Sequence, residues 1–210
     1  MRRLITALFA ALALFGCDDE EPARSSTSSS AEAPAHAAAT EGTRPGAPSG
    51  ATRNARAGGI AWVAPEPFRP VQPTSQMRAA EYVFPEGEGE SPASLTVFFF
   101  GPGQGGSIEE NVARWVGQFE QSDGTPSSQA ARITEREVNG LQVTLVDVSG
   151  TYSAMTPMGS RGGPATDQRM LGAIARGPQG PVFFKMVGPR EVMERAQPKF
   201  DELVSSFHAE

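Results

Sequence analysis

The feature that most constrains the fold is the point at which large apolar side chains begin to recur along the chain. From Asp18 to about Gly58 the sequence consists mainly of Ala, Ser, Thr, Pro and Gly, with almost no large apolar side chain. Such a segment cannot bury enough surface to offset the entropy that it loses on ordering. We therefore expect residues 17–58 to form a disordered tether. Residues 59–210, which have the length of one ordinary domain, are expected to form the folded part.

The N-terminal region has the layout of a bacterial export signal. Arg2 and Arg3 precede an apolar run over residues 4–15, and residues 14–17 read Leu-Phe-Gly-Cys. A charged start, a short apolar core and a small residue before the cut site are typical of such signals. The run is shorter than the roughly 20 residues that span a bilayer. Leu-x-Gly-Cys resembles the lipobox of bacterial lipoproteins, which implies that Cys17 is acylated; the alternative is an ordinary signal peptide with a chance cysteine.

Processing at this lipobox would remove residues 1–16 and tie the protein to a bilayer through Cys17. Two or three acyl chains hold a soluble domain at a membrane without help from its fold. We expect the anchor to lie in the cell membrane or the outer membrane, with the domain facing the periplasm or the cell exterior. Asp18 after the cysteine resembles the inner-membrane retention signal of enteric bacteria. Because that rule varies between lineages, both membranes stay open as alternatives.

The cysteine content limits how the fold can be stabilised, and the charge limits which partners the protein can bind. Cys17 is the only cysteine, so no intramolecular disulfide can form and the core alone must stabilise the domain. The formal net charge of −6 falls to −8 without residues 1–16, which hold two arginines and no acid. With Lys185 and Lys199 as the only lysines, the chain has no broad basic surface. These features argue against a nucleic-acid partner and against adhesion of the domain to anionic lipid.

Short runs rich in β-branched and aromatic residues, bounded by Pro and Gly, predict a mostly β domain. Asn139-Gly140 is the best hairpin signal, because Asn-Gly favours the positive backbone angles of a type I′ turn. Apolar side chains occupy both faces of the run 181–187, which indicates a central strand covered on both sides. The predicted strands are 59–64, 78–84, 94–100, 131–138, 141–148, 169–176 and 181–187.

Two helices are predicted. Ser107 and Glu110 form a capping box that begins the first, and Asp123-Gly124 marks its end. Gly188-Pro189 starts the second, in which Pro198 is expected to kink or restart the helix. Apolar residues recur at helical spacing in both: Ile108, Val112, Trp115, Val116 and Phe119, then Phe200, Leu203, Val204 and Phe207. Trp115 is interpreted as a core anchor rather than a ligand platform.

The order of these elements resembles the PsbP-like α/β/α sandwich. Two further matches carry this resemblance: Phe183-Phe184-Lys185 leading into Gly188-Pro189, and the ending Phe200-x-x-Leu203-x-x-Ser206-Phe207. The run Asn111-Val112-Ala113-Arg114-Trp115-Val116-Gly117-Gln118 is similar to one found in uncharacterised exported lipoproteins. The resemblance covers about residues 59–208 and implies an α+β fold, an antiparallel sheet flanked by helices. It also implies a non-catalytic assembly or binding protein, and it transfers no catalytic or metal-binding residue.

The residue inventory argues against common enzyme classes. The only histidines are His36, in the predicted tether, and His208, near the C-terminus. Nucleophilic triads therefore lack their base, and zinc sites built from His and Cys lack their ligands. Glu135 and Glu137 share one face of a predicted strand, but a solvated sheet edge explains them better than a catalytic pair. We predict no enzymatic activity, no cofactor and no metal.

A glycine-rich loop precedes the first predicted helix. Residues 101–107, and above all Gly105, Gly106 and Ser107, imitate part of a phosphate-binding loop at a helix N-terminus. The loop lacks the lysine that should precede the serine, and the neighbouring strands do not form parallel βαβ units. A tight strand-to-helix turn is the alternative interpretation, with a small anion or polar ligand as the less favoured one.

A stripe of hydrogen-bonding side chains on this helix is the better candidate surface, although solvated helix faces are also polar. Its members are Asn111, Arg114, Gln118 and Gln121. The long segment 149–168 is either a binding loop or a disordered one. The leading hypothesis is an envelope protein partner, and the alternative is a small ligand or an enzymatic substrate at the glycine loop and the 149–168 segment. A pocket converging on Arg114, Lys185 or Arg169 would favour a ligand, whereas a flat polar face would favour a protein partner.

Overall fold

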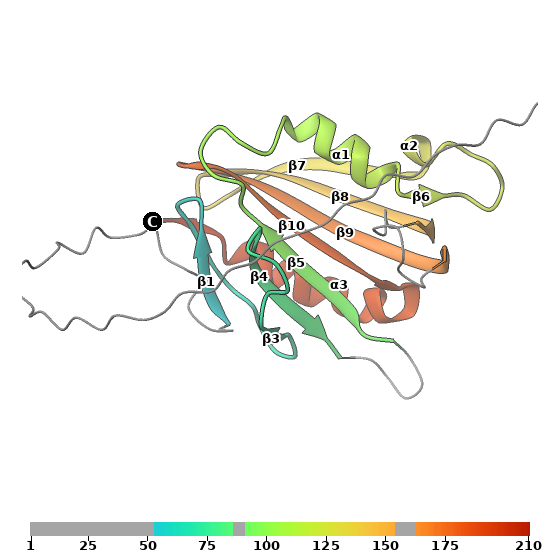
Figure 1. Ribbon diagram of the computed structural model, residues 1–210, viewed down its shortest axis with the longest axis horizontal. Helices are drawn as coiled ribbons and strands as arrows, with labels where there is room; N and C mark the ends of the chain where they lie inside the picture. Colours follow the sequence, from blue (N-terminus) through green and yellow to red (C-terminus); the bar gives the residue numbers. More distant parts are fainter. Residues whose placement is uncertain (1–52, 86–90, 154–162) are drawn as a thin grey trace, which may run out of the picture. The chain divides into compact units, whose positions relative to one another are not determined.

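The computed structural model describes residues 53–85, 91–153 and 163–210, and most of their strands form one antiparallel sheet. Its eight strands follow the order β3-β4-β5-β10-β9-β8-β6, and β7 also pairs with β8 (Figure 1). Every pairing between neighbours is antiparallel. The strands are β3 (Arg69–Val71), β4 (Arg78–Phe84), β5 (Ala93–Phe98), β6 (Phe119–Glu120), β7 (Arg132–Val138), β8 (Leu141–Tyr152), β9 (Ala165–Gly177) and β10 (Gly180–Pro189).

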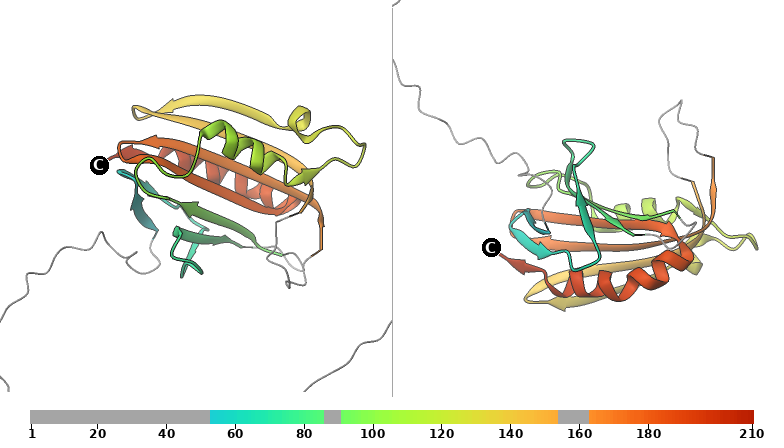
Figure 2. Two further views of the ribbon diagram at one scale, coloured as in Figure 1. Left: turned by 45° about the horizontal axis from the view of Figure 1, so that its top comes forward. Right: turned by 90° about the horizontal axis from the view of Figure 1, so that it is seen from below.

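Helices lie on both faces of this sheet. The helix α1 (Ile108–Val116) packs on one face and α3 (Arg190–Ser205) on the other (Figure 1, Figure 2). A single turn, α2 (Ser127–Ala130), lies between β6 and β7 in the chain. The predicted α+β fold class, an antiparallel sheet flanked by helices, is confirmed.

A second, three-stranded sheet contains β1 (Asn54–Ala57), β2 (Ile60–Val63) and β11 (His208–Ala209), in the order β1-β2-β11. Gly58 and Gly59 connect β1 to β2 with φ angles of +62° and +75°, which glycine adopts without steric cost. The expected boundary between tether and domain at residues 58 and 59 therefore falls inside a hairpin. Strand pairing through backbone groups needs no large side chain, so the sequence Asn-Ala-Arg-Ala of β1 carried no apolar signal.

Two apolar clusters lie on the two faces of the larger sheet. Successive side chains of β10 point to opposite faces and so contribute to both clusters. Phe184 and Met186 belong to the cluster beneath α3, whereas Phe183 belongs to the cluster beneath α1. β10 is thus a central strand covered on both faces, as predicted. Trp115 is only 4% exposed, and its ring lies so close to β9 that a Cβ on Gly172 would come within 2.7 Å of it. Trp115 is confirmed as a core anchor.

Several element boundaries differ from the predictions, and two of these differences concern the helices. α1 ends at Val116, because Gly117 caps it and Phe119 joins β6, which pairs with the end of β8; the predicted end at Asp123-Gly124 is wrong. α3 continues through Pro198 instead of restarting there. Pro198 is exposed, so water can solvate the carbonyl group that loses its intrahelical hydrogen bond.

Candidate functional site

The N-terminus of α1 is capped by two side chains of its own chain. The Ser107 hydroxyl accepts a hydrogen bond from the Glu110 N–H, and the Glu110 carboxylate accepts one from the Ser107 N–H, both at 3.1 Å. This is the predicted capping box. The bond to Ser107 lowers the pKa of Glu110, so the carboxylate stays charged at the helix terminus. An incoming phosphate would meet this negative charge, which disfavours a phosphate site in the glycine loop.

The glycine loop instead makes a tight connection to α1. Gly105 and Gly106 have φ angles of +98° and +76°. A Cβ on Gly105 would approach the rings of Phe100 and Phe183 to 2.9 and 3.1 Å. The Gly105 carbonyl also accepts a hydrogen bond from the Asn111 side-chain amide, at 2.7 Å. The geometry agrees with the interpretation of this loop as a strand-to-helix turn.

Polar side chains of α1 and of the turn after it lie near polar side chains of β8 and β10. The Asn111 side chain is anchored on Gly105 and accepts a hydrogen bond from Arg114. Gln118, in the turn that follows α1, accepts a hydrogen bond from the Lys185 ammonium. The Tyr152 hydroxyl accepts another from Lys185 at 3.1 Å, and the ammonium lies 5.2 Å from the centre of the tyrosine ring. We call Arg114, Gln118, Tyr152 and Lys185 the cationic cluster.

Among the described residues, no negative charge balances the two positive charges of the cationic cluster. Burial, and then the positive charge of Arg114, lower the pKa of Lys185 to about 8. Burial also raises the pKa of Tyr152, which keeps its hydroxyl protonated. Within residues 53–85, 91–153 and 163–210, the hydrogen-bond partners of Lys185 are neutral, and neither Arg114 nor Lys185 forms an ion pair.

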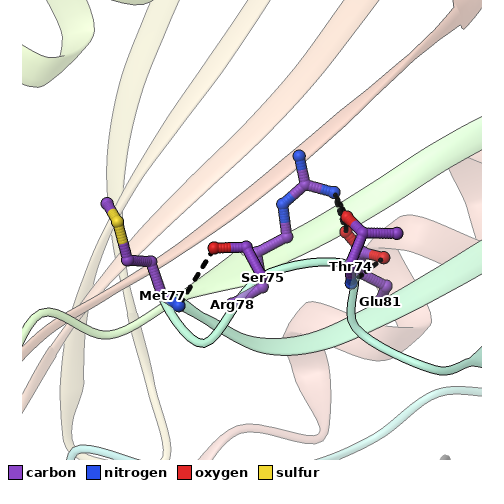
Figure 3. A network of polar contacts seen from close by, with 5 residues as sticks. All are labelled: Thr74, Ser75, Met77, Arg78 and Glu81. Atoms are coloured by element: carbon purple, nitrogen blue, oxygen red, sulfur yellow. Dashed lines mark hydrogen bonds and ion pairs between the residues drawn. The ribbon is translucent and has the colours of Figure 1, made fainter. Parts of the chain in front are cut away.

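The carboxylate that lies in register with Lys185 is already engaged. Thr96 of β5 stands between Glu81 of β4 and Lys185 of β10. Glu81 is only 5% exposed and accepts hydrogen bonds from the backbone N–H and hydroxyl of Thr74, each at 3.2 Å, and from Arg78 (Figure 3). Arg78 neutralises the charge of Glu81, which lies two strands away from Lys185. This carboxylate therefore does not neutralise Lys185.

Arg169 lies on the opposite face of the sheet. Its guanidinium donates hydrogen bonds to both carboxylate oxygens of Asp147, at 2.8 and 2.7 Å, and to Gln197 of α3 at 2.7 Å. The hydrogen bond to Asp147 is the main cause of its raised pKa. Arg169 thus ties β8 and β9 to α3, and it does not converge with Arg114 and Lys185.

The structure therefore brings together four of the predicted site residues, Asn111, Arg114, Gln118 and Lys185. Gly105 and Ser107 touch this group through their carbonyls, which both accept from Asn111 at 2.7 Å. Tyr152 was not among the predicted site residues, although it lies in the 149–168 segment that was expected to be either a binding loop or a disordered one. β8 runs to Tyr152 and β9 begins at Ala165, so both ends of the expected 149–168 loop are strands. Residues 154–162, and Cys17 with the rest of 1–52, lie outside the described residues.

Residues 53–85, 91–153 and 163–210 contain no group of three or more His, Cys, Asp or Glu side chains placed to hold a metal ion. Within the same ranges, no helix is both long and apolar enough to span a membrane.

Comparisons with known proteins concern the fold. The solution structure of cyanobacterial PsbP (CyanoP) from Synechocystis matches 72% of this chain and 87% of its own, with 13% identity and a TM-score of 0.44. The crystal structure of a protein of unknown function from Pseudomonas aeruginosa matches 75% of this chain and 96% of its own, with 10% identity and a TM-score of 0.41. No protein-family model and no curated protein sequence matches the chain.

Proposed function

We propose that this protein is a lipid-anchored component of a bacterial envelope whose folded domain binds a protein partner and performs no catalysis. The anchor is acylated Cys17, and residues up to about 52 tether the domain to the membrane. The binding surface is the cationic cluster on the α1 face. Its partner presents a carboxylate group, as an exposed Asp or Glu side chain does.

The observation that carries this proposal is the pair of neighbouring cations, Arg114 and Lys185, whose contacts in the described part of the chain are with neutral groups. A half-buried ammonium without a counter-ion is unfavourable, and an incoming carboxylate relieves this cost. The guanidinium of Arg114 can bind a carboxylate with two parallel hydrogen bonds, and Lys185 supplies a second charge. The protein is acidic overall, so these two cations mark a local surface of opposite sign.

Site-specific photo-crosslinking in the native cells tests the binding surface. A photoreactive residue at position 118 is expected to capture one defined envelope protein, and the same residue at position 202 of α3 is the matched control. Arg114→Glu should abolish the crosslink, whereas Arg114→Lys should keep part of it. Equal capture from both positions, or capture that survives Arg114→Glu, would contradict the proposed surface.

A small anionic ligand is the second candidate, because a carboxylate of any origin fits the same two cations. Acetate binding would raise the pKa of Lys185 by stabilising its charged form. This pKa can be followed by NMR of the lysine side chain in wild type and in Arg114→Gln. An acetate-dependent rise that needs Arg114, together with no protein crosslink at position 118, would favour the small ligand. The enzymatic alternative at the glycine loop is disfavoured by the Glu110 carboxylate at the α1 terminus.

The anchor is tested separately. Mass spectrometry of the mature N-terminus is expected to find an acylated Cys17, and Cys17→Ser should move the protein from the membrane fraction to the soluble fraction. An unmodified thiol, or a Cys17→Ser protein that stays with the membranes, would overturn the anchoring proposal while leaving the binding surface untouched.

A further inference from the structure

A groove of about 560 Å³ lies on the side of α1 that faces away from the cationic cluster. Its floor is apolar, with Val112 and Val116 of α1 on one side and Ile133 of β7 on the other. Ile133 is 49% exposed, which makes it one of the few large apolar side chains that the described residues leave in water. Such an apolar depression is a common feature of binding sites.

The groove borders an open strand edge. β7 pairs with β8, and within residues 53–85, 91–153 and 163–210 no strand pairs with its other side (Figure 1). Val138 and Leu141 face each other directly across the two-residue turn and so form a hydrogen-bonded pair. Counting back by alternation, Ile133, Glu135 and Glu137 direct their backbone N–H and C=O groups away from β8. An open edge of this kind is a template for another strand.

The charges around the groove restrict what such a strand can be. Glu109 of α1 and Glu135 of β7 both line the groove, and none of its described lining residues is a Lys or Arg. Glu137 follows Glu135 on the same face of β7, because side chains alternate along a strand. On the other face of β7 lie Arg132 and Arg136. A strand that complements this edge therefore carries basic residues toward the groove and an acidic residue on the opposite face.

A second copy of this chain does not meet that requirement. Two copies of β7 can pair about a two-fold axis, with the same face of each strand on the same side of the sheet. Each register that pairs most of the residues of β7 then places like charges opposite each other. Pairing about Thr134 sets Arg132 against Arg136, and pairing about Glu135 or Arg136 sets that residue against its own copy. Like charges directly opposite each other destabilise a sheet.

We propose that the groove and the open edge of β7 together bind an extended segment of a different protein, which adds an antiparallel strand to the sheet. An apolar side chain of this segment lies beside Ile133 and fills the groove, and basic side chains lie opposite Glu135 and Glu137. Read from its N-terminus, the segment has the pattern basic, acidic, basic, polar, apolar. This surface is distinct from the cationic cluster, since the two lie on opposite sides of α1.

The probe is the synthetic peptide Val-Lys-Glu-Lys-Thr-Ile-Glu, added to the full-length isotope-labelled protein and followed by NMR. The expected result is a shift of the amide signals of Ile133, Glu135 and Glu137, with slower hydrogen exchange at these amides. A peptide with Lys and Glu exchanged is the matched control and should bind at least about fivefold more weakly. The absence of shifts at these amides at millimolar peptide, or equal binding of both peptides, would overturn the proposal.

Two variants separate this proposal from general peptide adhesion. Glu135→Lys, at an exposed position, is expected to reduce or reverse the preference between the two peptides. Glu202→Lys on α3 makes the same charge change on the other face of the sheet and should leave the preference as it is. An unchanged preference in Glu135→Lys, or signals of β7 that shift with protein concentration alone, would contradict a heterologous strand. The Arg114→Glu variant should bind the peptide normally, so the two surfaces are tested independently.

Discussion

Lys185 holds its charge in a half-buried position where the described hydrogen-bond partners are neutral oxygens. Burial and the charge of Arg114 lower its pKa from 10.5 to about 8. Below pH 8 both the folded and the unfolded chain carry this proton, so the fold bears the full cost of the buried charge. Between pH 8 and 10.5 the unfolded chain binds the proton more tightly, and the free energy of unfolding must therefore rise with pH.

Replacing Lys185 removes this cost. Lys185→Met is expected to be more stable than wild type at pH 7, by up to about 3 kcal/mol, and the difference should shrink toward pH 10. Urea unfolding at both pH values measures it. Lys199→Met is the control, because Lys199 is 40% exposed and pairs with Glu202 at the surface. Parallel pH profiles for wild type and Lys185→Met would show that the fold does not perturb this lysine.

At the scale of elements, the sequence predicted the features that depend on residues close together along the chain. The capping box at Ser107, the Asn139-Gly140 turn and the two-sided β10 all depend on neighbouring residues, and all three are confirmed. The two-residue strand β6 was missed because it is defined by its partner on β8. The same limit applied to the site. The stripe of polar side chains was visible in the sequence, but Lys185 of β10 joins Gln118 to Tyr152 of β8 through hydrogen bonds between residues 67 and 33 positions apart.

The packing of α1 on β9 gives a prediction at this scale. The Trp115 ring occupies the space that a side chain at Gly172 would need, with a closest approach of 2.7 Å to an added Cβ. Gly172→Ala is therefore expected to lower the free energy of unfolding by about 1–3 kcal/mol. In the double variant with Trp115→Phe, the smaller ring should relieve part of this loss, so that the two effects are less than additive.

Chemical denaturation of the single and double variants measures this coupling. Gly163→Ala is the control, since a Cβ at Gly163 meets no atom of the described residues within 4 Å. Strict additivity of Gly172→Ala and Trp115→Phe would mean that α1 does not rest on β9 through this contact.

The whole molecule uses the two faces of its larger sheet for different purposes. The α3 face holds the larger apolar cluster, and there Arg169 pairs with Asp147 of β8 and donates a hydrogen bond to Gln197 of α3. The α1 face bears the smaller cluster, and next to it lie the cationic cluster on one side of the helix and the groove on the other. A change to an exposed residue of the α1 face should therefore alter binding with little effect on stability, which depends mainly on the opposite face.

The N-terminal limit of the folded unit can be measured by truncation. β1 pairs with β2 through four residues, and the Ala64 N–H donates a hydrogen bond to the Arg53 carbonyl at 2.9 Å. A chain that begins at residue 53 is expected to unfold at the same temperature as one that begins at residue 18, because the described core lies after residue 53. A chain that begins at residue 59 lacks β1 and should be less stable by about 1–2 kcal/mol, a large share of the stability of a domain of this size. Calorimetry of the three proteins distinguishes the two boundaries. Equal stability of the chains that begin at residues 53 and 59 would mean that the folded domain starts after the β1–β2 turn. A loss of stability in the chain that begins at residue 53 would mean that the tether contributes to the fold.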